Sequence, residues 1–358
     1  MKEVEVRLAA NSYNIRIGSN LLMQTGRWLK ESGFADKLVI ITNPVVKKLY
    51  GDALERNLTK EGFRVTVLLV PDGEEQKSLE VAGRLYTELA SCYAERMTPV
   101  LALGGGVIGD LAGFVAATYL RGVPLVQIPT TLLAQVDSSI GGKVAVNLGQ
   151  VKNIVGAFYQ PGLVISDIGV LKTLPAKEFT NGLAEVIKYA MACDQELFIF
   201  IEQNLDRVKS LDDEVLGEVV FRSAKIKAGI VEKDEKDLGL RAVLNYGHTV
   251  GHAIESAADF KIRHGEAVAV GMLAAASISH KLGMLDENAI TRLRNVVERA
   301  GLPVKMPDLE VDRMVQAIKH DKKILSGKIR FVLPKLIGET LITEVNTSLI
   351  EQVLVDSG

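Results

Sequence analysis

The chain has 358 residues, 42 basic and 44 acidic side chains, and a net charge of −2 at pH 7. Because one hydrophobic core stops growing at about 250–300 residues, two domains are expected. The balanced charge excludes the basic face that nucleic acid or an anionic membrane surface would require, and it favours a small-molecule partner. Cys92 and Cys193 are the only cysteines, which excludes a disulfide framework and a thiolate metal cluster and fits a reducing cytoplasm.

The sequence shows no export or membrane signal. From Met1 it alternates charged with apolar residues and lacks the apolar core and cleavage site of a signal peptide. The most apolar stretch, 100–120, contains five glycines and Asp110, which a lipid-embedded helix would avoid. We therefore expect no membrane partner and a cytoplasmic location.

Short apolar runs alternate with helical patterns in the first half of the chain. The expected strands are 37–42, 64–70, 99–103, 124–128 and 163–166, and the expected helices include 44–61 and 79–94. The runs show little alternation of apolar and polar residues, which is typical of strands buried on both faces. This pattern predicts a mostly parallel, Rossmann-like α/β sheet, and nucleotides bind such sheets at the carboxyl edge.

The pattern changes after Leu174. Thr173, Pro175 and Glu178 form a helix start, and long stretches of 3.6-residue periodicity follow. Strand candidates are nearly absent until 329–334. We therefore predict an α/β domain over 1–175 and a mainly helical domain over 176–358 that ends in a short returning strand or two.

Gly104 to Gly109 match GxGxxG after a predicted strand and before a helical pattern. Backbone amides and the helix N-terminus at such a loop hold a pyrophosphate, although a tight turn packed on the sheet is the alternative. The ribose-binding acid expected about twenty positions later is absent. The segment 72–77 (DGEEQK) could supply carboxylates and Lys77 instead, with an acidic surface turn and a helix start at Ser78 as the alternative.

Three of the five histidines, His248, His252 and His264, lie within seventeen residues. Imidazoles and carboxylates are ligands of Zn²⁺, and a catalytic zinc typically takes three protein ligands. His248 and His252 share a helical face, but this spacing alone does not decide whether both bind metal. Glu185 stands among apolar residues on a predicted helix and requires a cation, which could be a metal or simply Lys188 one turn away.

A glycine-rich, apolar region brings together polar side chains suited to a charged ligand. Asp137, Lys143, Lys152 and Asn153 all fall within it, and we expect it to be a loop. Lysines there suit phosphate or carboxylate oxygens, whereas a solvated surface is the alternative for each lysine alone.

Several long motifs, in order along essentially the whole chain, resemble the 3-dehydroquinate synthase family of sugar phosphate cyclases. They are GGGVIGDLAGFVAATYLRG from Gly104, PTTLLAQVDSSIGGKVAVN from Pro129, KNIVGAFYQP from Lys152, GLAEVIKYA from Gly182, LNYGHTVGHAIE from Leu244, HGEAVAVGM from His264 and DKK from Asp321. Departures are small: GEEQKS stands where a tyrosine commonly precedes the lysine, and Tyr246 occupies a variable site.

The resemblance implies an NAD-binding α/β domain, a helical metal-binding domain and an active site in the cleft between them. The implied enzyme is a lyase of the shikimate pathway, which makes aromatic amino acids. It converts 3-deoxy-D-arabino-heptulosonate 7-phosphate to 3-dehydroquinate and phosphate by transient oxidation, phosphate elimination, reduction, ring opening and aldol closure. A homodimer is also implied, because Arg121 resembles an arginine that enters the neighbouring subunit's site.

The resemblance also assigns residues to roles. Zinc, with Co²⁺ as an alternative, falls to Glu185, His248 and His264. The substrate phosphate falls to His252, Lys152, Asn153, Asn245 and one of Lys322 or Lys323, the carboxylate to Lys143, Lys227 and Arg241, and the hydroxyls to Asp137, Glu185 and Lys188. NAD falls to Asp72, Gly73, Glu74, Glu75, Gln76, Lys77, Gly106, Val107, Ile108, Gly109, Asp110, Thr130, Thr131, Val170, Leu171, Lys172 and Thr173, with Lys143 and Lys152 beside it.

Three other functions stay open from the sequence. Related cyclases act on sedoheptulose 7-phosphate or glucose 6-phosphate, and Lys227 and Arg241 favour the carboxylate-bearing heptulosonate over these. A metal-dependent NAD polyol dehydrogenase would share the two-domain plan but release NADH. A non-catalytic nucleotide sensor is the third alternative, and it would not need the metal ligands or the lysines.

Overall fold

The structure is a computed structural model that describes residues 1–149, 151–259, 261–321 and 328–356. Clustering of contacts divides it into two units. The first comprises Met1–Leu174 with Lys227–Lys236, and the second comprises Pro175–Ile226 with Asp237–Gly358. Helix α8 (Asp213–Lys233) contributes residues to both. Each unit is described by itself.

The first unit is built on a seven-stranded sheet with the order β1-β2-β9-β6-β5-β3-β4. Its strands are β1 (Lys2–Val6), β2 (Tyr13–Gly18), β3 (Lys37–Thr42), β4 (Arg64–Leu69), β5 (Val100–Gly104), β6 (Leu125–Pro129) and β9 (Leu163–Asp167). Among the described residues of this sheet, β1 and β2 pair antiparallel, and the other neighbouring strands pair parallel. The predicted mostly parallel α/β sheet is thus confirmed.

Helices cover both faces of this sheet because successive strand residues point to opposite sides. Their bounds are α1 (Thr25–Glu31), α2 (Pro44–Val46), α3 (Asp52–Lys60), α4 (Leu79–Ser91) and α5 (Gly106–Thr118). Val39 and Ile41 of β3 share one core with α4 and α5, whereas Leu38 and Ile40 share the other with α1 and α3. The burial of both faces explains why these strands lack alternation in sequence.

The order of five of the six parallel strands has a functional consequence. In chain order they are β3, β4, β5, β6 and β9, and in space they run β4-β3-β5-β6-β9. The connections therefore leave in opposite directions from β3 and β5. Ligands of open α/β sheets bind at the carboxyl ends of the strands beside such a switch point. The glycine loop after β5 stands at this point.

Two hairpins depart from the sequence expectation. The region carrying Lys143, Lys152 and Asn153 is not a loop: it forms the antiparallel hairpin β7 (Lys143–Leu148) and β8 (Val151–Phe158). Alternation of buried Val144 and Val146 with the less buried Lys143, Ala145 and Asn147 was the missed signal, because glycines concealed it. Strands β1 and β2 were also not predicted, although charged and apolar residues alternate in β1.

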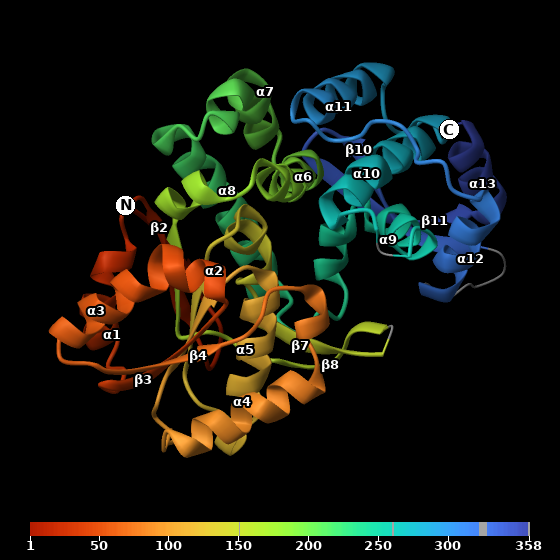
Figure 1. The fold of residues 1–358 in the computed structure, drawn as a ribbon. Coiled ribbons are helices and arrows are strands. Elements are labelled where there is room, and N and C mark those ends of the chain that lie inside the picture. Colours follow the sequence, from red (N-terminus) through yellow and green to blue (C-terminus); the bar gives the residue numbers. More distant parts are fainter. Residues whose placement is uncertain (150, 260, 322–327, 357–358) are drawn as a thin grey trace. The chain divides into compact units, whose positions relative to one another are not determined.

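The second unit is mainly helical, as predicted. Its helices are α6 (Ala176–Cys193), α7 (Gln195–Lys209), α9 (His248–Ala257), α10 (His264–Lys281), α11 (Glu287–Arg299), α12 (Val311–Asp321) and α13 (Thr347–Asp356), together with the first part of α8. Buried α10 packs against both α6 and α9 (Figure 1). The predicted returning strands are the hairpin β10 (Lys328–Leu336) and β11 (Glu339–Asn346).

Candidate functional site

The glycine loop of the first unit leaves a helix N-terminus open to an anion. Strand β5 ends at Gly104, and α5 begins at Gly106 without a side-chain cap. A Cβ at Gly104 would lie 2.7 Å from the Ile108 side chain, so the turn needs glycine there. The first amides of an α-helix have no partner within the helix and carry a partial positive charge. The loop therefore fits a phosphate group.

The segment 72–77 lies next to α5 through Lys77. The Lys77 ammonium is buried, and its Nζ lies 2.5 Å from Oδ2 of Asp110. The same Nζ donates to Oδ1 of Asn153 on β8. Burial raises the pKa of Asp110, and the charge of Lys77 opposes this. The structure thus joins three residues that the sequence assigned separately to cofactor and substrate.

Asn147 is a polar residue of this region that the sequence analysis missed. Its Oδ1 accepts from the backbone N–H of Asn153 at 2.9 Å, and its Nδ2 donates to Oε1 of Glu74 at 2.9 Å. Its own N–H donates to the carbonyl of Lys77 at 2.7 Å. The β7–β8 hairpin is therefore fastened to the 72–77 segment. An asparagine in a strand gives no sequence signal of this role.

The other assigned residues of the first unit lie at several places around the sheet. Lys227 is buried, and its Nζ donates to Oδ1 of Asp137 at 2.7 Å and to the Asp137 carbonyl at 2.8 Å. Thr130 and Thr131 follow β6, and Val170, Leu171, Lys172 and Thr173 lie in the 3-10 helix η6 (Ile168–Thr173). Lys143, Lys152 and Arg121 are exposed. Arg121 has φ 66° in a turn of left-handed backbone.

Glu185, His248 and His264 come together in the second unit. One ligand atom from each lies within 4.8 Å of the others, although they stand on the separate helices α6, α9 and α10. Nε2 of His264 lies 3.3 Å and Nε2 of His248 lies 3.7 Å from Oε1 of Glu185. This is the set of three protein ligands that a catalytic zinc uses.

Glycines allow the three helices to approach this closely. A Cβ on Gly265, beside His264, would lie 2.2 Å from the Asn181 carbonyl on α6. A Cβ on Gly271 would lie 2.0 Å from the Gly247 carbonyl at the start of α9, and Gly247 itself has φ 78°. The Asn181 side chain also accepts from the Gly265 N–H at 2.5 Å. Close packing at these glycines positions the histidines against Glu185.

The electrostatics of the group fit a bound cation. Burial raises the pKa of Glu185, but Lys188 and the two histidines outweigh it and hold the pKa well below its usual range. The Glu185 side chain is 1% exposed, and neither oxygen has a hydrogen bond of ordinary geometry, although Oε2 is in ion-pair contact with Lys188. An incompletely paired buried carboxylate is costly, and a bound cation would stabilise it.

The two imidazoles present the same nitrogen to Glu185. Nδ1 of His248 lies 3.2 Å from the Tyr246 carbonyl, and Nδ1 of His264 lies 3.1 Å from Oε2 of Glu255. Burial lowers the pKa of His248 well below its usual value. Burial also lowers the pKa of His264, but Glu185 and Glu255 outweigh it and raise the pKa to about 10. Nε2 of both rings is thereby directed at one point.

The second unit carries the other residues that the resemblance assigned to the substrate. Lys188 forms an i, i+3 ion pair with Glu185. From the sequence, this ion pair was the alternative to a metal beside Glu185. His252 is exposed and belongs to a second set of three potential ligands with Glu255 and His264. Arg241 is buried, and Asn245 ends the 3-10 helix η7 (Leu240–Asn245). Lys322 and Lys323 lie outside the described residues.

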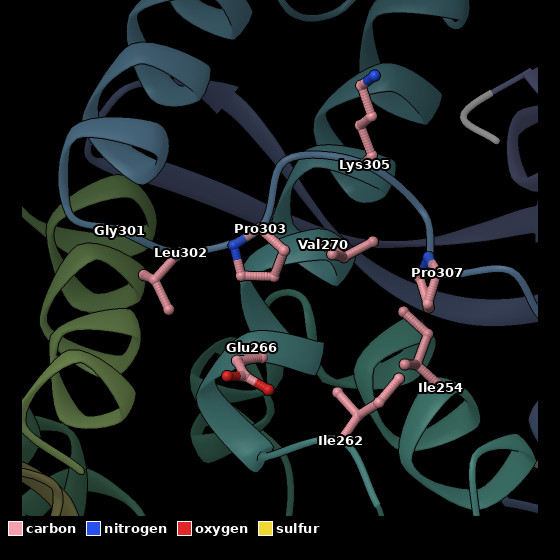
Figure 2. A pocket seen from close by; sticks show the side chains of 9 residues that line it. All are labelled: Ile254, Ile262, Glu266, Val270, Gly301, Leu302, Pro303, Lys305 and Pro307. Carbon is pink, nitrogen blue, oxygen red and sulfur yellow. The ribbon is translucent and has the colours of Figure 1, made fainter. Parts of the chain in front are cut away.

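The second unit also contains a pocket of about 470 Å³. Two charged residues, Glu266 and Lys305, line it together with Ile254, Ile262, Val270, Gly301, Leu302, Pro303 and Pro307. Figure 2 shows the Lys305 side chain directed away from the other side chains. None of the three potential metal ligands lines it. We therefore do not place the reaction in this pocket.

Among the described residues, no helix has the length and apolar character needed to span a bilayer.

An open helix N-terminus on an α/β sheet, together with two histidines around a buried glutamate, defines the class as a candidate metalloenzyme with an anion-binding domain. Sequence models of the 3-dehydroquinate synthase N-terminal and C-terminal domains match residues 67–181 and 182–324. The chain belongs to the 3-dehydroquinate synthase family.

Similar proteins agree with this assignment. A 3-dehydroquinate synthase of Dehalococcoides mccartyi is 51% identical over 344 residues, with 96% of each chain covered. A 2-deoxy-scyllo-inosose synthase solved with carbaglucose-6-phosphate, NAD⁺ and Co²⁺ has a TM-score of 0.92 at 26% identity, with 100% of each chain covered. A 2-epi-5-epi-valiolone synthase from Streptomyces hygroscopicus subsp. jinggangensis, solved with NAD⁺ and Zn²⁺, has a TM-score of 0.90 at 29% identity, with 98% of each covered.

Proposed function

We propose that the chain is a 3-dehydroquinate synthase that uses NAD and a divalent metal, Zn²⁺ or Co²⁺. Its substrate is 3-deoxy-D-arabino-heptulosonate 7-phosphate, and its products are 3-dehydroquinate and phosphate. The Glu185–His248–His264 group is the observation that carries this proposal, because a nucleotide-sensing protein would not need it. Family membership favours this enzyme over a polyol dehydrogenase.

Elimination of phosphate requires removal of a proton from the carbon next to the phosphate-bearing carbon. This proton is not acidic while the neighbouring group is an alcohol, so the alcohol must first be oxidised to a transient ketone. When bound, the metal lowers the pKa of a coordinated hydroxyl and polarises a carbonyl, and NAD takes up and returns a hydride. Glu185, His248 and His264 would hold the metal. The 72–77 segment, the glycine loop from Gly106 to Asp110, and residues 130–131 and 170–173 would hold NAD. Phosphate elimination, ring opening and aldol closure complete the change.

The remaining polar residues would hold the substrate by its charged ends. Lys152, Asn153, Asn245 and His252, with Lys322 or Lys323, would bind the phosphate as donors and point charges. Lys143, Lys227 and Arg241 would bind the carboxylate, and Lys143 and Lys152 would also lie beside NAD. Asp137, Glu185 and Lys188 would orient the reacting hydroxyls. Held at both ends, the substrate reacts as one oriented molecule, which supplies much of the acceleration.

The proposal also includes an oligomeric state and a location. Arg121 is exposed and follows Leu120, which also has positive φ. We propose that this turn enters the site of a second copy, so that the enzyme is a homodimer. Two cysteines without a disulfide fit a reducing compartment, and we propose the cytoplasm.

A substrate panel tests the proposal. The metal-loaded protein with NAD⁺ is incubated separately with the heptulosonate phosphate, sedoheptulose 7-phosphate, glucose 6-phosphate and glycerol. We expect phosphate release with the heptulosonate phosphate only. Phosphate release from either of the other sugar phosphates would select a related cyclase, and net NADH from glycerol would select a polyol dehydrogenase. Inactivity with all four would contradict the enzyme assignment.

A further inference from the structure

A second carboxylate, Glu255, is buried beside the potential metal ligands. It stands on α9, two turns after His248, and its side chain is 8% exposed. Oε2 of Glu255 lies 3.1 Å from Nδ1 of His264. Burial of a carboxylate is costly unless it is paired, so this contact with the His264 ring requires an explanation.

The contact determines which nitrogen of His264 can bind a metal. A carboxylate only accepts hydrogen bonds, so Nδ1 of His264 carries the hydrogen in this pair. In the neutral ring the lone pair is then on Nε2, which faces Oε1 of Glu185 at 3.3 Å. His248 obtains the same orientation from the backbone carbonyl of Tyr246. His264 is therefore the ligand whose orientation depends on a side chain.

We propose that Glu255 is a positioning residue for the metal centre: it fixes the orientation and tautomer of His264 and does not itself bind the ion. This inference rests on the proposed metal site. Histidine ligands of metals usually donate their second N–H to a carboxylate or carbonyl in this way. The competing arrangement is the set His252, Glu255 and His264, in which Glu255 is a ligand. That arrangement would use Nδ1 of His264 and leave Nε2 to Glu185 alone.

Two substitutions separate the hydrogen-bond acceptor from the charge. E255Q keeps an acceptor oxygen, whereas E255L removes it. E266Q is the matched control, because Glu266 lies in the first turn of α10 and is not in contact with His264 in any described pair, and glutamine preserves its capping-box position. Zinc affinity and the rate of zinc loss are measured by competition with a chelator. The visible absorption of the Co²⁺ form reports coordination geometry, and thermal unfolding of the metal-free variants reports folding.

We expect E255L to weaken zinc binding by about 10–100-fold and to lose zinc faster, as outer partners of metal ligands do. E255Q should restore most of the affinity with an unchanged Co²⁺ spectrum, and E266Q should match the unmodified protein. If E255L does not fold, the Co²⁺ spectrum of E255Q decides. A spectrum that differs from that of the unmodified protein would overturn the inference, and an identical spectrum would support it.

Other outcomes also decide the matter. Equal affinity in E255L and the unmodified protein would overturn the positioning role. A second zinc ion per chain that disappears in E255Q would assign Glu255 as a ligand instead. If the unmodified protein itself binds no zinc, the proposed metal centre fails first. That failure differs from the case in which the unmodified protein binds zinc and the Glu255 variants bind it equally well, which would refute only the positioning role.

Discussion

Nε2 of His264 lies 3.3 Å from Oε1 of Glu185, and this contact joins the first turn of α10 to the middle of α6. Nε2 of His248 approaches the same oxygen at 3.7 Å. The other oxygen, Oε2, faces Lys188. Glu185 can therefore give one oxygen to a metal while Lys188 keeps the other, so the ion pair and the metal site are compatible.

Removing Glu185 or His264 as a metal ligand should abolish metal binding and turnover together. We expect E185Q and H264A to weaken zinc binding by more than the about 10–100-fold expected for an outer partner. Metal content after dialysis and the rate of phosphate release measure the two effects. H280A is the control, because His280 lies on the same helix and contacts the Leu285 carbonyl at 2.9 Å. Full activity in a metal-free E185Q or H264A protein would refute the assignment.

Zinc affinity should rise with pH. The pKa of His264 is raised to about 10, so at neutral pH the metal-free ring is protonated and the metal must displace a proton. Glu185, with its lowered pKa, and His248, with its lowered pKa, release none. We expect about a tenfold gain in affinity per pH unit between pH 6.5 and 8.5. Chelator competition corrected for the chelator's own protonation measures it, and a flat profile would contradict a protonated His264.

Gly265 should not tolerate a side chain. In G265A the new Cβ would lie 2.2 Å from the Asn181 carbonyl, so α10 must move away from α6 and carry His264 with it. We expect weaker zinc binding and a lower melting temperature, both from backbone displacement. G83A is the matched control, because a Cβ there meets nothing within 4 Å and alanine favours a helix. Unchanged zinc affinity in G265A would show that the approach at Gly265 does not position the ligand.

Removing the ammonium of Lys77 should destabilise the first unit. Its partner Asp110 is 17% exposed at the side chain and would be left as an unpaired buried carboxylate in K77M. Breaking such a pair costs about 3–5 kcal/mol. Urea unfolding measures the loss, and D110N in the K77M background should recover part of it by removing the charge. A loss below about 1 kcal/mol, the range of exposed pairs, would mean that water solvates Asp110.

The sequence predicted the parallel sheet and the helical second unit because the spacing of apolar residues reflects which side chains are buried. Strands such as 37–42 are apolar on both faces, and Val39 and Leu38 indeed face opposite cores. The β7–β8 hairpin was wrongly expected as a loop, because its glycines and lysines resemble loop composition. Its strand character follows from pairing between Lys143 and Phe158, which no local pattern displays.

The metal group could be assigned only through resemblance. Spacing placed His248 and His252 on one helical face, yet the contact that matters joins His248 to residues on α6 and α10. Close approach at Gly265 and Gly271 produces this contact, and one glycine in a helix looks like any other in sequence. Glu255 and Asn147 were missed for the same reason, since each acts on a neighbour that is distant in sequence.

The most direct test of the proposed function counts turnovers per NAD. The zinc-loaded protein, with NAD⁺ equimolar to it, is given a large excess of the heptulosonate phosphate. Phosphate, dehydroquinate and absorbance of NADH are followed together. We predict many molecules of phosphate and dehydroquinate in equal amounts per NAD, with no net NADH. NADH accumulating with product, or product formation that stops after one turnover per NAD, would contradict it.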